Sequence, residues 1–137
     1  MDKRIAYAGV AVLALHSLVH LLGAVVYLEL VALEGFAYKT TLLGGAVDVG
    51  ATGIRLFGFL WAVTGVAFLV AAKAVLSGWQ HWRPALVAVA LVSLVLTTAD
   101  FSVAYGGVLM NVAIVTAVVY EKRVLSESTT SDYGQIG

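Results

Sequence analysis

Residues 5–28 read IAYAGVAVLALHSLVHLLGAVVYL and contain no Asp, Glu, Lys or Arg. As a helix, which rises ~1.5 Å per residue, such a stretch is long enough to cross the ~30 Å hydrocarbon core of a bilayer. It is too long for the apolar core of a cleaved signal peptide. The stretch therefore predicts a first membrane-spanning helix, and with it the class of the whole fold.

The composition of the whole chain agrees with a membrane protein. Of its 137 residues, 61% are hydrophobic and 12% are charged, and the mean hydropathy is +0.98. A soluble domain has no way to bury so much apolar surface. The net charge of zero gives no electrostatic reason to expect nucleic acid as a partner. Because the chain has no cysteine, disulfides, thiolate catalysis and cysteine-ligated metal centres are excluded.

Three further apolar stretches predict three more spans. The expected spans are residues 5–28, 54–76, 85–99 and 104–120. A polar turn with Trp79 and Trp82 separates the second span from the third, and tryptophan is common at headgroup depth. Short connections favour an all-α, up-and-down four-helix transmembrane bundle over residues 1–124. The Ser- and Thr-rich segment 125–137 is predicted to be a disordered tail.

The connection between the first two spans, residues 29–53, is longer than a bundle needs. It is predicted to be an interfacial helix, a re-entrant segment or a lid. Basic residues are retained on the cytoplasmic side of a membrane. Most of them fall on the side of both termini, namely Lys3, Arg4, Lys73, Arg83, Lys122 and Arg123, against Lys39 and Arg55 on the other side. Both termini are therefore predicted to be cytoplasmic, with the long connection outside.

Polar residues of the predicted spans gather on particular helical faces. In the first span, His16, His20 and Tyr27 share one face because of their helical spacing. The later spans carry polar groups at Arg55, Ser93, Thr97, Asp100 and Asn111. Given the predicted orientation, these groups converge in the outer half of the bundle. We expect an outward-facing polar pocket, with ligand-binding residues His16, His20, Tyr27, Arg55, Asp100 and Asn111.

The two histidines allow several chemistries. At a spacing of i, i+4 they can bind one divalent metal ion, with Asp100 or Asp48 as a carboxylate ligand. One of them can instead be an axial ligand of haem. They can also bind a ligand or handle protons without a metal, or form hydrogen bonds between helices. These alternatives stay open at this point.

Charged and small residues at the helix faces suggest contacts between spans. Arg55 and Asp100 either form an ion pair at the outer mouth, which binds an anionic headgroup or gates a path, or they are a structural pair or two interfacial charges that never meet. The small residues Gly58, Ala62 and Gly65 form a strip that allows close helix approach and dimerisation. The predicted helix-packing residues are Gly23, Gly58, Ala62, Gly65 and Gly107.

Several motifs resemble a family when they are taken together. They are HSLVHLLG at 16–23, RLFGFLW at 55–61, FLVAA at 68–72, the tryptophan-containing turn before Pro84, and SLVLTTAD at 93–100 followed by Gly107 and Asn111. The chain thereby resembles a loose group of small, mostly uncharacterised prokaryotic four-helix integral membrane proteins. The resemblance implies a multi-pass protein of the plasma membrane and brings no activity or cofactor. It implies joint importance for His20, Gly23, Gly58, Trp61, Asp100, Gly107 and Asn111.

The function expected from these features is a binding or transport module for a small ligand, a lipid headgroup or an ion. One alternative is a redox membrane subunit that binds haem b or a quinone through His16 or His20. Another is a structural or assembly partner in a membrane complex. The sequence contains no Ser-His-Asp set, paired catalytic carboxylates or nucleotide fingerprint, so an enzyme is not expected. The expected partners are the lipid bilayer and either further copies of the chain or a larger membrane complex.

Overall fold

The computed structural model describes the backbone of residues 3–134 and the side chains of residues 3–121. Its long helices are α1 (Lys3–Tyr27), α2 (Gly50–Leu76), α3 (Trp82–Ala99) and α4 (Phe101–Gly134). Segments long and apolar enough to span a membrane occur in all of them, at Lys3–Tyr27, Gly50–Leu76, Trp82–Ala99 and Phe101–Glu121. The chain is thus all-helical in architecture, and the prediction of a multi-pass membrane protein with four candidate spans is confirmed.

The helix ends differ from the predicted spans by a few residues. α2 begins at Gly50 rather than residue 54, and α3 begins at Trp82, which places Pro84 in its first turn. In α4 the backbone leaves helical geometry at Ala104, with φ −108° and ψ 18°, so a single turn precedes the predicted start of the fourth span. Beyond Glu121 only the backbone is described, and it continues α4 into the segment 125–137, where disorder stays a prediction.

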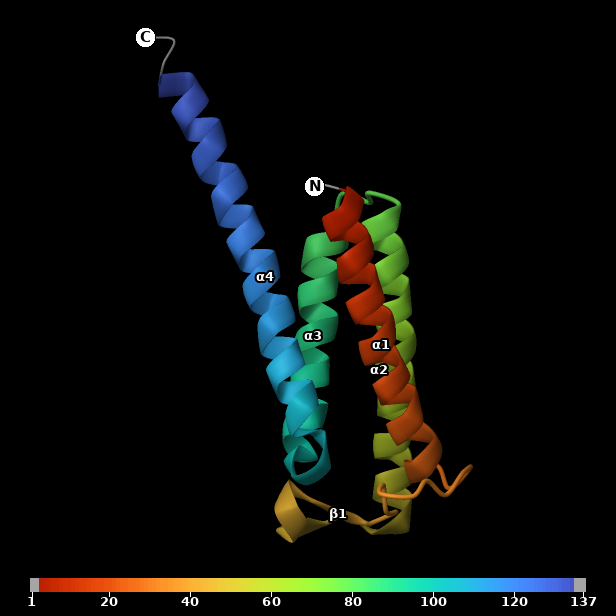
Figure 1. Ribbon diagram of the computed structural model, residues 1–137. Coiled ribbons are helices and arrows are strands. Elements are labelled where there is room, and N and C mark those ends of the chain that lie inside the picture. The colour runs from red at the N-terminus through yellow and green to blue at the C-terminus, as the bar shows by residue number, and fades with distance from the viewer. Residues whose placement is uncertain (1–2, 135–137) are drawn as a thin grey trace.

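The helices pack in the order of the chain (Figure 1). α1 runs along α2, α2 contacts α3, and α3 contacts α4. The start of α1 and the far end of α4 lie at one end of the bundle, which we call the termini end, and the connection between α1 and α2 lies at the opposite end. α4 leans away from the other helices towards the termini end. The helices of the bundle are therefore splayed at the termini end and close together at the opposite end.

Glycines allow α1 and α2 to approach closely. A Cβ atom on Gly58 would lie 2.8 Å from the Cβ of Tyr27, and one on Gly65 would lie 3.0 Å from the side chain of Leu21. Ala62, between these glycines, packs against the same buried cluster as Tyr27. The strip that the sequence suggested for dimerisation is therefore occupied within the chain by α1. Small residues show that a helix can pack closely but not which helix will do so.

The connection from α1 to α2 forms a short hairpin across one end of the bundle (Figure 1). It consists of β1 (Thr41–Leu42), the 3₁₀ turn η1 (Leu43–Gly45) and β2 (Val47–Asp48), with antiparallel pairing of β1 and β2. Gly44 and Gly45 have φ values of 67° and 96°, which glycine adopts without strain. η1 lies against the start of α4. Of the three predicted arrangements, the connection has that of a lid; we call this end of the molecule the hairpin end.

A carboxylate joins the hairpin to α2 and gives a pH-dependent contact. Asp48 Oδ1 accepts a hydrogen bond from the Gly50 N–H at 2.9 Å. This bond, followed by one from the Thr40 hydroxyl, lowers the pKa of Asp48 below its usual 3.8. Because the folded-state pKa is the lower one, the contact stabilises the hairpin at neutral pH and is lost as the pH falls through that folded pKa.

We therefore expect a carboxyl ¹³C NMR titration of Asp48 to have its midpoint below pH 3.8. In Thr40→Val the midpoint should move up, because one of the two hydrogen bonds to the carboxylate is gone. A midpoint that does not change in the variant would contradict the assigned role of the Thr40 hydroxyl.

Candidate functional site

A cluster of polar side chains lies buried where α1, α3 and α4 meet. His20 Nε2 lies 2.7 Å from Ser93 Oγ, and His16 Nε2 lies 3.2 Å from Asn111 Oδ1. Asn111 Nδ2 donates to Ser93 Oγ at 2.7 Å. The four side chains are at most 5% exposed. The structure therefore brings together three of the predicted site residues, His16, His20 and Asn111. We call these three residues and Ser93 the polar core.

Thr97 and Gly107 complete the wall of the polar core. Thr97 Oγ1 donates to the Ser93 carbonyl at 2.8 Å and lies 3.4 Å from Asn111 Nδ2. A Cβ atom on Gly107 would lie 2.7 Å from Cγ2 of Thr97, so α3 and α4 can approach here only because residue 107 is glycine. Ser93 and Thr97 were not among the predicted ligand-binding residues. Their helical spacing with Asp100 was the signal that could have placed them in this buried polar cluster.

The hydrogen bonds of the polar core have a consistent direction. The Asn111 oxygen can only accept, so His16 donates from Nε2, and the Asn111 amide donates to Ser93. The Ser93 oxygen accepts this bond, and we assign its hydroxyl hydrogen to His20 Nε2, 2.7 Å away. A neutral His20 that accepts at Nε2 carries its proton on Nδ1. We infer that His20 Nδ1 is a donor.

Two buried polar atoms at the edge of the polar core have no hydrogen-bond partner among the described residues: His20 Nδ1 and Trp61 Nε1. Both side chains are 1% exposed, and their ring centroids lie 4.8 Å apart. The ring of Phe68 lies 5.7 Å from that of His20. An unsatisfied buried donor costs about 1–3 kcal/mol. Trp61, which the resemblance marked as important, is thus a core residue that contributes one of the two unsatisfied donors.

A second polar group lies nearer the hairpin end, around Asp100. The Tyr27 hydroxyl donates to Asp100 Oδ2, and Lys39 Nζ lies 2.5 Å from Asp100 Oδ1. Lys39 also donates to Ser102 Oγ at 2.9 Å. The Asp100 side chain is fully buried, whereas that of Lys39 is 25% exposed. Lys39 lies in the lid just before β1. Its contacts therefore join the lid to the turn between α3 and α4.

Arg55 does not meet Asp100. It pairs with Glu29 at 2.7 Å, and both side chains are largely exposed, at 60% and 44%. Arg55 thus lies outside the buried group that includes Tyr27 and Asp100. The ion pair between Arg55 and Asp100, one of the two predicted arrangements, does not form, because Lys39 takes that position and Arg55 finds its acid at the end of α1.

The hypothesis of a metal ion held by the two histidines and a carboxylate finds no support in this geometry. Within the described side chains no group of three or more His, Cys, Asp or Glu residues is placed to hold a metal ion. Asp100 is engaged by Tyr27 and Lys39, and Asp48 bonds to the start of α2. The rings of His16 and His20 meet edge to face with centroids 5.0 Å apart. The carboxylates proposed as further ligands are therefore held by other partners.

Comparison of the chain with protein-family models, with curated proteins and with solved structures found no match.

Proposed function

We propose that this chain is a membrane-embedded binding or transport module that accepts a small ligand carrying a hydrogen-bond acceptor next to His20. The observation that carries this proposal is a pair of buried nitrogens, His20 Nδ1 and Trp61 Nε1, for which the described residues offer no hydrogen-bond partner. Two N–H groups favour a carbonyl, carboxylate or similar oxygen over a cation. Buried polar groups are satisfied in nearly all proteins, so an unmet pair at a polar core points to a bound partner.

The distribution of polarity suggests the side from which the ligand enters. Polar side chains lie on this side at two places: Lys39 and Asp100 form an ion pair at the hairpin end, and Ser93 and Asn111 form a hydrogen bond in the polar core. On the other side of His16 the core is apolar, formed by Leu13, Phe68, Ala71, Ala72, Val75, Leu86, Ala90 and Ile114. A polar ligand therefore enters from the hairpin end, and the contact between Lys39 and Asp100 acts as the latch.

The same proposal places the hairpin end outside the cell, in the plasma membrane of a prokaryote, with both termini in the cytoplasm. The excess of Lys and Arg at the termini end supports this orientation. Further copies of the chain or a larger membrane complex are compatible with it. The strip of Gly58 and Gly65 is not the surface that would form such an oligomer, because α1 covers it.

Cysteine labelling tests the latch cleanly, because the natural chain has no cysteine. In reconstituted vesicles we expect Ser93→Cys to react slowly with a charged methanethiosulfonate reagent, and only from the hairpin end. Lys39→Met should raise the rate by roughly tenfold, which corresponds to about 1.4 kcal/mol of lost stabilisation of the closed form. Acetate, a small acceptor, should slow the labelling, whereas ammonium should not.

The matched control is Ala90→Cys, one turn away on α3 in the apolar cluster, where the side chain is fully buried. It should stay unreactive with and without Lys39. Equal acceleration at residues 90 and 93 would mean general loosening of the bundle and would contradict a latch. Labelling of residue 93 from the termini end would reverse the proposed side of entry.

A structural or assembly role is the second candidate, favoured by the hydrogen bonds that join α1 to α3 and α4. In that case the polar core serves packing alone. Ser93→Cys should then remain unreactive in every variant, and acetate should change nothing. No contact among the described residues specifically favours the alternative of a redox subunit that binds haem b or a quinone.

A further inference from the structure

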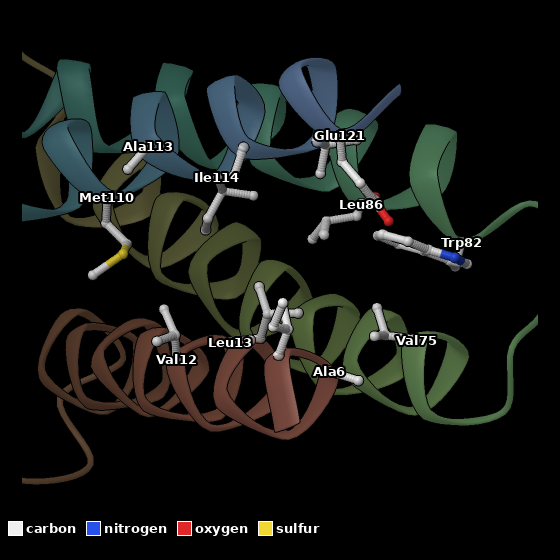
Figure 2. Close-up of a pocket in the computed structure, with 14 residues that line it drawn as sticks. Ala6, Val12, Leu13, Val75, Trp82, Leu86, Met110, Ala113, Ile114 and Glu121 are labelled. Atoms are coloured by element: carbon white, nitrogen blue, oxygen red, sulfur yellow. The ribbon is translucent and has the colours of Figure 1, made fainter. Parts of the chain in front are cut away.

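A groove opens between α1 and α4 at the termini end, away from the polar core. The two helices meet at the hydrogen bond between His16 and Asn111 and then diverge. The space between them has a volume of about 510 Å³. Figure 2 shows Val12 and Ala6 on one wall and Met110, Ala113 and Ile114 on the other. The groove therefore begins at mid-bundle depth and widens towards the membrane surface.

The lining of the groove is apolar along its length. Leu13, Val75 and Leu86 come from three different helices and close it on the inner side (Figure 2). Polar character appears only near the mouth, where Trp82 and Glu121 lie. Glu121 is paired with Arg83 at 3.1 Å. An occupant must thus have a long aliphatic part inside the groove and a polar part at its mouth.

We propose that this groove binds one acyl chain of an anionic glycerolipid, with the headgroup at the mouth beside Trp82 and Arg83. Within the bilayer core no water is available to fill the space, and a void would forfeit the dispersion contacts of its walls. A lipid chain can lie along a groove that is apolar on several sides. Tryptophan at the mouth is the residue type that lies at headgroup depth.

Charge at the termini end selects an anionic headgroup. Lys3, Arg4 and Lys73 belong to this end, whereas Arg83 forms an ion pair with Glu121, the acid that lines the mouth. Basic side chains near a membrane surface attract anionic lipids. A second copy of this chain, packed on the groove in the same orientation, would instead bring the basic residues of two termini ends close to one another, which is repulsive. The charge pattern therefore favours a lipid over a second copy.

Native mass spectrometry of the protein released from nanodiscs tests the proposal. With phosphatidylglycerol and phosphatidylcholine in equal amounts, we expect one retained phosphatidylglycerol per chain. Gly9→Leu should lower its retention at least about tenfold, the effect of losing the burial of about two methylene groups. Gly9 lines the groove, and a Cβ atom there meets nothing within 4 Å, so the leucine fills the groove without a clash.

The matched control is Gly106→Leu on α4, which also has free space at its Cβ position but does not line the groove. It should retain the lipid as the natural chain does. Equal loss in both variants, or no loss in Gly9→Leu, would overturn the proposal. A dimer that only Gly9→Leu dissociates would also overturn it, because the groove would then bind a second copy.

A second measurement avoids any change inside the groove. Phosphatidylglycerol with brominated acyl chains should quench tryptophan fluorescence more strongly than brominated phosphatidylcholine. Trp82→Phe should remove that difference, because Trp82 lines the mouth, whereas Trp79→Phe should preserve it. A difference that persists without Trp82, or that is absent in the natural chain, would contradict binding in the groove.

Discussion

Replacing Gly23 by alanine should destabilise the protein by about 1–3 kcal/mol, the usual range for overpacking a well-packed core. A Cβ atom at this position would lie 2.4 Å from Cε3 and 2.5 Å from Cζ3 of Trp61. The Trp61 ring cannot move away easily, because it is 1% exposed and packs against Tyr27, Phe57 and His20. The extra methyl group must therefore separate α1 from α2.

Gly9→Ala is the matched control on the same helix, since its Cβ atom would be in open space. It should leave the free energy of unfolding unchanged or raise it by up to about 1 kcal/mol, because alanine favours the helix. SDS titration of the purified protein in mixed micelles, followed by circular dichroism, measures both variants. If Gly23→Ala were as stable as Gly9→Ala, the close contact between Gly23 and Trp61 would be wrong.

The spans and the buried histidines could be predicted from the sequence for physical reasons. Lipid admits only long apolar segments as helices, so the candidate spans follow from hydropathy. Polar side chains are expensive in lipid and turn towards the bundle interior. The helical spacing of His16 and His20 therefore indicated the buried face of α1, on which His16 lies 3.2 Å from Asn111 of α4.

The charge pairs at the hairpin end could not be predicted in the same way. Glu29, Asp48 and Asp100 are all acids near this end, and Lys39 and Arg55 are the basic residues available to them. Which base meets which acid depends on the path of the hairpin. That path rests on local backbone conformations such as the positive φ values of the glycines in η1. No helical periodicity extends through this connection, so the sequence could not show that Lys39, rather than Arg55, is the partner of Asp100.

The strip of small residues on α2 shows a different limit. Gly58 and Gly65 were correctly expected to allow close helix packing, but their partner is α1 of the same chain. The sequence pattern is the same for an intramolecular and an intermolecular partner. The groove between α1 and α4 was not predicted. The residue pattern of a single helix does not show how far a neighbouring helix diverges from it.

The two ends of the bundle therefore have opposite chemistry. Towards the hairpin end, α1, α3 and α4 meet through hydrogen bonds around His16, Ser93 and Asn111. Towards the termini end, α1 and α4 separate, and their facing side chains are aliphatic. The hydrogen bond between His16 and Asn111 is the point where these regions meet. A ligand in the polar core and a lipid chain in the groove would thus both act on the spacing of α1 and α4.

Removing the positive charge of Lys39 should have a large effect on stability. We expect Lys39→Met to lower the free energy of unfolding by about 2 kcal/mol, between the values known for exposed and for buried ion pairs. The reason is that Asp100 is fully buried, so without Lys39 its charge has, among the side chains of residues 3–121, only the Tyr27 hydroxyl as a partner. Arg55→Met is the matched control and should show no measurable loss, because the pair of Arg55 and Glu29 is exposed.

A double-mutant cycle separates the ion pair from other effects of the lysine. Asp100→Asn should cost stability in the natural background but restore much of the loss in Lys39→Met, because a neutral amide does not need a cation. Unfolding by SDS titration gives the four free energies. Additive losses in the double variant would show that Lys39 and Asp100 do not interact. In that case the hairpin would be held by its other contacts alone, and the latch proposed for the polar core would have no physical basis.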